Sequence, residues 1–139
     1  MEIKSNEATP LRPEGDRVLD ADLVQMDLNE FIRQIKEEST WAEGDRNSIA
    51  IYKSDTLRIV LLGLRQNAEF ITHQANGNIS VQVLEGRIKF STEQKSVTLD
   101  KGQMLALHEN IPHSVTALKE SFFLLTLAMT GQESAVDWF

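Results

Sequence analysis

Three histidines, His73, His108 and His113, are the side chains of this sequence best suited to acid–base or ligand chemistry. An imidazole changes its charge near neutral pH, so it can act as an acid or a base. The chain has no cysteine, which excludes disulfides and thiolate chemistry. Burial favours the uncharged imidazole, so His73 and His113 also fit a neutral, hydrogen-bonded role in a core. Both interpretations stay open on the sequence.

The elements that would position these histidines are short strands. The clearest is a hairpin predicted over residues 79–90, in which Ile79, Val81 and Val83 alternate with polar residues. Alternation with period two is typical of a strand with one face on a core. Gly86 supplies the backbone freedom that the turn of this hairpin requires.

Further strands are predicted on both sides of the hairpin, over residues 48–53, 56–65, 69–74, 97–99, 104–107, 113–117 and 122–128. The strand at 56–65 is apolar on both faces, as expected of a strand that is covered on both sides. Short strands at intervals of about ten residues predict an all-β sandwich or barrel.

One helix precedes the strands. Asp27 is its predicted N-cap, Glu30 completes a capping-box pattern, and the helix is expected to end near Thr40. Its apolar stripe consists of Leu28, Phe31, Ile32 and Ile35. A short strand is also expected within residues 18–26, with Leu23 and Val24 as its apolar part.

The 139 residues predict one domain. Within it we expect an N-terminal arm (1–16), a helix with edge strands (17–55), a barrel (56–128) and a C-terminal tail (129–139). The net charge of −7, with no basic block, argues against nucleic-acid binding. The longest apolar runs are too short to cross a bilayer, and the polar start lacks the apolar core of a signal peptide. These features predict a cytoplasmic protein.

Two segments resemble the motifs of small cupins. They are Val83-Leu84-Glu85-Gly86 and Asp100-Lys101-Gly102, the latter followed by a strand and by Ile111-Pro112-His113. The resemblance covers roughly residues 56–128. It implies an RmlC-like, all-β fold, the cupin double-stranded β-helix or jelly-roll barrel, with one N-terminal α-helix. Because cupins commonly pair through edge strands, it also implies a homodimer, with the arm, the helix and the tail as candidate covers.

The resemblance also implies where a metal would bind. Metal-binding cupins carry two histidines and a glutamate in the first motif and one histidine in the second. Here those positions hold His73, Ala75, Ile79 and His113. Two imidazoles are fewer than the three protein ligands usual in catalytic metal sites. We therefore expect no cofactor and no tightly bound metal; a divalent ion at His73 and His113 is the alternative.

The resemblance further implies a pocket with apolar walls and a few polar groups, as in many small-molecule sites. We expect His73 and His113 near its mouth, with His108 close by. The expected apolar lining is Ile79, Val81, Val83 and Val115. The sequence thus favours a protein that binds a small organic ligand. A metal-dependent oxygenase or isomerase using His73 and His113 is the alternative, and no catalytic residue is assigned.

Overall fold

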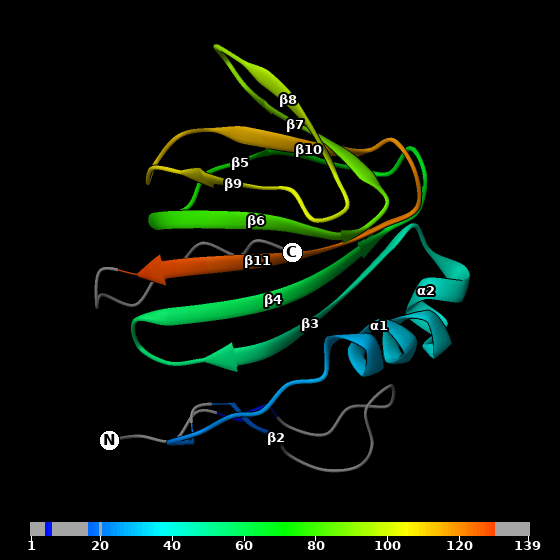
Figure 1. Ribbon diagram of the computed structural model, residues 1–139, viewed down its shortest axis with the longest axis vertical. Helices are drawn as coiled ribbons and strands as arrows, with labels where there is room; N and C mark the ends of the chain where they lie inside the picture. The colour runs from blue at the N-terminus through cyan, green and yellow to red at the C-terminus, as the bar shows by residue number, and fades with distance from the viewer. Residues whose placement is uncertain (1–4, 7–16, 20, 130–139) are drawn as a thin grey trace.

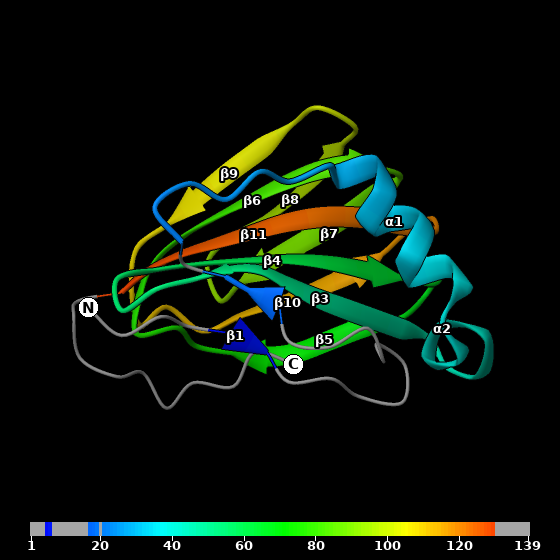
Figure 2. The ribbon, with the colours of Figure 1, turned by 90° about the horizontal axis from the view of Figure 1, so that it is seen from below.

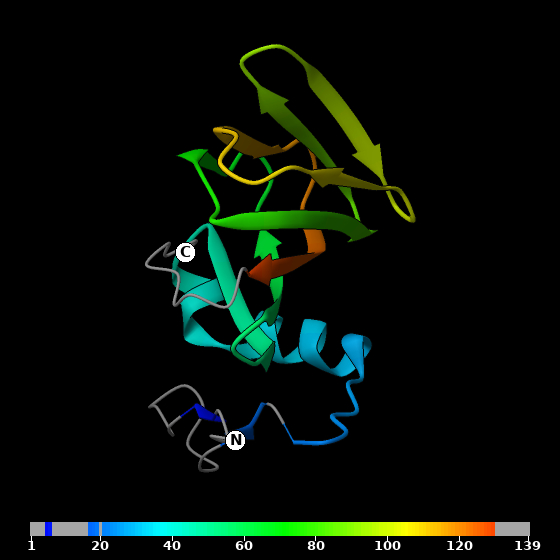
Figure 3. The same cartoon turned by 90° about the vertical axis from the view of Figure 1, so that its left-hand side faces the viewer.

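The computed structural model describes residues 5–6, 17–19 and 21–129 (Figure 1). Most of the predicted arm and the predicted tail beyond Met129 lie outside these residues. Within them, the chain forms two antiparallel sheets that face each other, a small two-stranded ribbon and two helices (Figures 1 and 3).

The larger sheet has five strands in the order β3-β4-β11-β6-β9. Their bounds are β3 Arg46–Lys53, β4 Leu57–Leu64, β11 Ser121–Met129, β6 Gly77–Glu85 and β9 Met104–Leu107. The second sheet has the order β5-β10-β7-β8. Its strands are β5 Glu69–His73, β10 His113–Ala117, β7 Arg87–Thr92 and β8 Ser96–Asp100. The ribbon pairs β1 Ser5–Asn6 with β2 Arg17–Val18.

An inner core fills the space between the two sheets, because strands of both sheets turn an apolar face inward. Along β6, for example, buried residues alternate with more exposed ones. The members of the inner core are Val60, Leu62, Leu64, Ala68, Phe70, Ala75, Ile79, Val81, Val83, Ile88, Phe90, Leu99, Val115, Ala117, Phe123, Leu125 and Leu127. The all-β barrel predicted from the strand spacing is therefore confirmed.

The predicted hairpin over residues 79–90 is wrong in its pairing. Both strands exist as β6 and β7, but β6 pairs with β11 and β9, whereas β7 pairs with β10 and β8. The chain crosses from one sheet to the other at Gly86, which has φ +91°. Alternation shows that a strand buries one face, but it does not identify the neighbouring strand.

The helical segment starts as predicted and ends earlier. Helix α1 (Leu28–Glu37) begins at Asp27, whose side chain accepts hydrogen bonds from the backbone of Asn29 and Glu30. Glu38 then adopts an extended conformation, and a second short helix, α2 (Ser39–Glu43), carries the chain past the predicted end at Thr40. The strand expected within 18–26, with Leu23 and Val24, is also wrong: among the described residues 17–19 and 21–26, only Arg17–Val18 form a strand, and Leu23 is 87% exposed.

The two helices cover the outer face of the five-stranded sheet (Figure 2). Their apolar residues form an outer core with that face, made of Ile32, Ile35, Trp41, Ile49, Ile51, Leu61 and Phe122. Strand β4 therefore contributes to both cores, as its two apolar faces predict. A buried polar contact joins the layers, because Asn47 Nδ2 donates to Glu38 Oε1 at 2.8 Å. None of the described helices is long and apolar enough to span a membrane.

Candidate functional site

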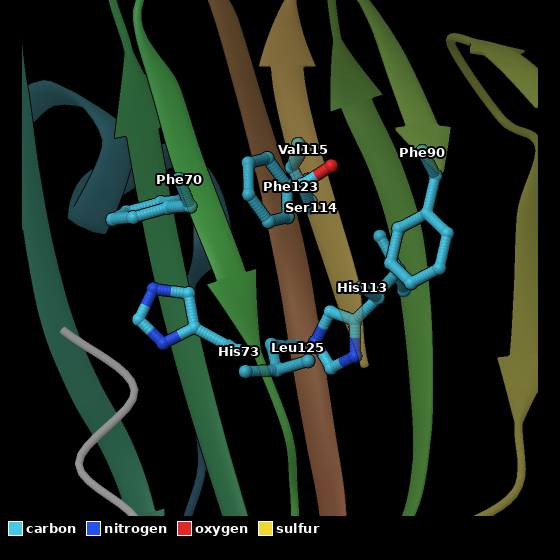
Figure 4. Close-up of a pocket in the computed structure, with 9 residues that line it drawn as sticks. Phe70, His73, Phe90, His113, Ser114, Val115, Phe123 and Leu125 are labelled. Atoms are coloured by element: carbon cyan, nitrogen blue, oxygen red, sulfur yellow. The ribbon is translucent and has the colours of Figure 1, made fainter. Parts of the chain in front are cut away.

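Two strands of the smaller sheet place His73 and His113 directly opposite each other. His73 is the last residue of β5 and His113 the first of β10, and the two residues are antiparallel partners. We call this end of the molecule the histidine end of the barrel. Figure 4 shows both imidazoles beside a cavity between the sheets.

An irregularity in β5 lets this strand contribute two neighbouring side chains to the cavity. His73 opposes His113, but Phe70 opposes Val115, so three steps along β5 match two along β10. Such a β-bulge turns residues that would otherwise face opposite sides toward the same side. As a result both Phe70 and His73 line the cavity (Figure 4).

Aromatic rings surround the two imidazoles. The ring of His113 stacks on Phe90 with centroids 5.2 Å apart and 14° between the planes. His73 meets Phe70 edge-on at 6.0 Å. The full lining is Phe70, His73, Val81, Phe90, His113, Ser114, Val115, Phe123 and Leu125. The cavity measures only about 10 Å³, which is room for about one water molecule.

His113 is held as a neutral base. Its side chain is only 3% exposed, and its Nδ1 lies 2.9 Å from the carbonyl oxygen of Ile111. Because a carbonyl oxygen can only accept, Nδ1 carries the hydrogen and Nε2 keeps its lone pair. Burial, and to a lesser degree the charge of His73, lowers the pKa of His113, against the opposing effect of the bond to Ile111. The imidazole is therefore uncharged at neutral pH.

The predicted pocket residues are divided between the cavity wall and the core around it. His73, His113, Val81 and Val115 line the cavity. Ile79 and Val83 belong to the inner core but not to the cavity wall. His108 follows the end of β9, is exposed, and is not part of the lining.

The sequence prediction missed the three phenylalanines of the lining. Phe90 has the parity of the inward face of β7, and Phe123 lies in a predicted strand, so the alternation pattern contained a signal for both. Phe70 had none, because the bulge between Phe70 and His73 changes the parity of β5.

A larger hollow adjoins the site. It measures about 220 Å³ and is lined by Thr92, Glu93, Gln94, Leu107, Ile111 and Pro112. Thr92 is the strand partner of His113 on β7, and Ile111 binds the His113 ring. The histidine end therefore offers more room in this hollow than in the cavity lined by the two histidines.

The donor set does not fit a tightly bound metal ion. Among the described residues, no group of three or more histidine, cysteine, aspartate or glutamate side chains lies close enough together to hold one. Ala75 and Ile79 occupy two of the four positions of the metal-binding pattern, and each is 3% exposed in the inner core. Two imidazoles alone fall short of the three protein ligands of catalytic sites.

No protein-family model and no curated protein matches the sequence. Solved structures do match. A cupin-2 domain-containing protein of Shewanella frigidimarina has a TM-score of 0.60 at 16% identity, over 74% of this chain and 93% of its own. A cupin superfamily protein of Desulfitobacterium hafniense has a TM-score of 0.59 at 15% identity, over 60% of this chain and 77% of its own. The chain has the cupin fold. A cupin 2 conserved barrel domain protein of Leptotrichia buccalis matches at 30% identity with a TM-score of 0.59, over 62% of this chain and 42% of its own.

Proposed function

We propose that this cupin binds a small organic ligand at the histidine end of its barrel, without a tightly held metal ion. One observation carries the proposal: His73 and His113 face each other among aromatic side chains, while Ala75 and Ile79 fill the remaining positions of the metal-binding pattern. Apolar walls with a few oriented polar groups are typical of small-molecule sites.

The chemistry of the site defines how such a ligand would be held. Its apolar part packs against Phe70, Phe90 and Phe123, and its hydrogen-bond donor meets the lone pair on Nε2 of His113. Because the cavity has room for about one water molecule, the rest of the ligand occupies the adjoining hollow, or aromatic side chains rotate to admit it.

A thermal-shift screen of small organic compounds tests the proposal on tag-free protein treated with a chelator. A ligand that binds only the folded state at about 100 times its Kd adds about 2.7 kcal/mol, which raises the Tm by at least about 5 °C. His73→Gln and His113→Gln should reduce the shift, whereas the control His108→Gln should not. The proposal fails if no compound class raises the Tm, or if the three variants respond alike.

A metal-dependent oxygenase or isomerase is the competing hypothesis. The observation in its favour is the direct opposition of two imidazoles, one of which carries its lone pair on Nε2. Metal analysis after purification without an affinity tag separates the two hypotheses. We expect less than one ion per chain, lost on mild chelation. One retained ion per chain, absent from the His73→Gln/His113→Gln double variant, would favour the enzyme.

A further inference from the structure

Two cations lie side by side where β3 ends and β4 begins. Lys53 is the last residue of β3, Arg58 the second of β4, and they are direct antiparallel partners. Like charges placed opposite each other on neighbouring strands destabilise a sheet. Such a pair is unexpected in a chain whose net charge is −7, because acidic residues are plentiful.

Both side chains leave the sheet on its inner face. Strand β4 pairs with β11 without a register shift, so its side chains alternate strictly between the faces. Val60 and Leu62 belong to the inner core, and Arg58 shares their parity. The β11 partner of Arg58 is Leu127, which also lies in the inner core. Since paired residues share a face, Lys53 points to the same side.

The cation pair lies at the histidine end of the barrel. Residues 65–68 connect the end of β4 to the start of β5, so the beginning of β4 and the end of β5 lie at the same end. Figure 3 looks at this end of the molecule. On the other side of Leu127 the next strand partner is Ile79, and beyond it Leu107, which lines the hollow. Two buried residues of the inner core, Leu127 and Ile79, therefore separate Arg58 from the hollow along the sheet.

Arg58 differs from the other arginines whose side chains the structure describes. Those four form ion pairs: Arg33 with Glu30, Arg46 with Asp45, Arg65 with Glu120 and Arg87 with Asp100. Within the described part of the chain, Arg58 has no such pair, and its Nε is buried without a hydrogen bond. A buried donor without an acceptor is costly, and an anion beside it would remove this cost together with the repulsion from Lys53.

We infer that the ligand of this barrel is an organic acid whose carboxylate binds Arg58 and Lys53. The inference rests on the proposed function and names the chemical class of its ligand. A planar guanidinium matches the two oxygens of a carboxylate, and an ammonium adds a second charged contact. The apolar body of such an acid packs against the aromatic lining of the cavity, as in the proposed function.

Matched acids and amides provide the test, because each amide keeps the shape of its acid but lacks the charge. Benzoate with benzamide, and butanoate with butanamide, are titrated into wild-type protein by calorimetry at low salt. We expect the acids to bind at least about tenfold more tightly than the amides, and the preference to shrink as salt is added. Equal binding of acid and amide, or binding of neither, overturns the inference.

Variants assign the charge preference to the cation pair. Arg58→Gln and Lys53→Gln should each weaken acid binding at least about tenfold, and Arg58→Lys should weaken it less. Arg33→Gln, on the exposed side of α1, is the matched control and should leave it unchanged. Without ligand, Arg58→Gln should melt no lower than wild type, because it removes the like-charge pair.

The inference and the proposed function can fail separately. If neutral compounds bind in a manner that depends on His113 while Arg58→Gln has no effect, the ligand site stands and the organic acid is excluded. If acids bind but His73→Gln and His113→Gln bind them as wild type does, the anion site is supported and the role of the two histidines in ligand binding is excluded.

Discussion

The side chain of His113 is constrained in three ways. It stacks on Phe90, binds the Ile111 carbonyl through Nδ1, and is almost fully buried. These contacts fix both the ring orientation and the tautomer, so Nε2 keeps its lone pair at neutral pH. A side chain held in this way can accept a hydrogen bond from a ligand without first losing a proton.

The lowered pKa of His113 predicts that acid weakens the fold. The unfolded chain binds a proton near the ordinary value of 6.5, whereas the folded chain binds it only at lower pH. Stability is therefore fully present above pH 6.5 and is lost as the pH falls through the pKa of the folded state. Each tenfold difference in proton affinity contributes about 1.4 kcal/mol.

Urea unfolding of wild type, His113→Phe and His108→Gln from pH 7.5 to pH 4.5 measures this effect. His113→Phe should lose less stability over this range than wild type, because it removes the group that must be protonated. The exposed His108→Gln should follow wild type. If the stability of all three proteins fell in parallel with pH, protonation of His113 would not be the cause of the loss.

The corner between β6 and β7 depends on Gly86. Its φ is +91°, and an added Cβ would lie 2.3 Å from both the Glu120 carbonyl oxygen and Ser121 Oγ. Gly102 also has a positive φ, +84°, but a Cβ there meets nothing within 4 Å. The two glycines thus separate the cost of backbone strain from the cost of a steric clash.

Alanine at each position measures the two costs. Gly102→Ala should lower the free energy of unfolding by about 1 kcal/mol, the cost of a left-handed backbone in a residue with a side chain. Gly86→Ala should cost more than about 3 kcal/mol, because backbone must also move. Chemical denaturation gives both values. Equal losses would show that the corner adapts to the Cβ.

The helices depend on a buried amide as well as on the outer core. Asn47 Nδ2 donates to Glu38 Oε1 and, at 3.3 Å, to the Ile35 carbonyl oxygen at the end of α1. Asn47→Ala should destabilise the protein by about 1–3 kcal/mol, because it removes a donor from a buried carboxylate. Asn29→Ala, on an exposed position of α1, is the control and should change stability by less than about 0.5 kcal/mol. Equal unfolding curves would refute the role of Asn47.

The sequence predicted where the helices and strands lie better than it predicted which strands pair. The strands followed from alternation, and the start of α1 from Asp27, because these signals are local. Three features depend on contacts distant in sequence and left no local signal. They are the separation of β6 from β7, the bulge in β5, and the helix break at Glu38, which bonds to Asn47 of β3.

The fold of the whole molecule was predicted from two short motifs more than from the pattern of its strands. The resemblance to cupins implied the barrel, and the solved structures confirm that fold. It also placed His73 and His113 at one site, where the structure has them as strand partners. The aromatic lining and the cation pair lay outside the motifs, so neither could be predicted from the resemblance.

The homodimer remains a prediction, and the edge strand β5 suggests where to test it. Ile71 of this strand is 73% exposed, and an exposed apolar edge invites pairing with another chain. Light scattering at micromolar concentration should give about twice the chain mass of 15.7 kDa. Ile71→Lys should shift it toward the single-chain mass, whereas Lys119→Gln, at an exposed turn, should not. A single-chain mass for wild type would contradict the dimer.

Strand β11 lies between β4 and β6, although it follows every other described strand in the sequence. While the ribosome is still making residues 121–129, the middle of the larger sheet is missing, and both cores lack a wall. The barrel therefore cannot form progressively during translation. Until β11 arrives, β4 and β6 expose apolar edges, so chaperone binding to the nascent chain would protect it most at this stage.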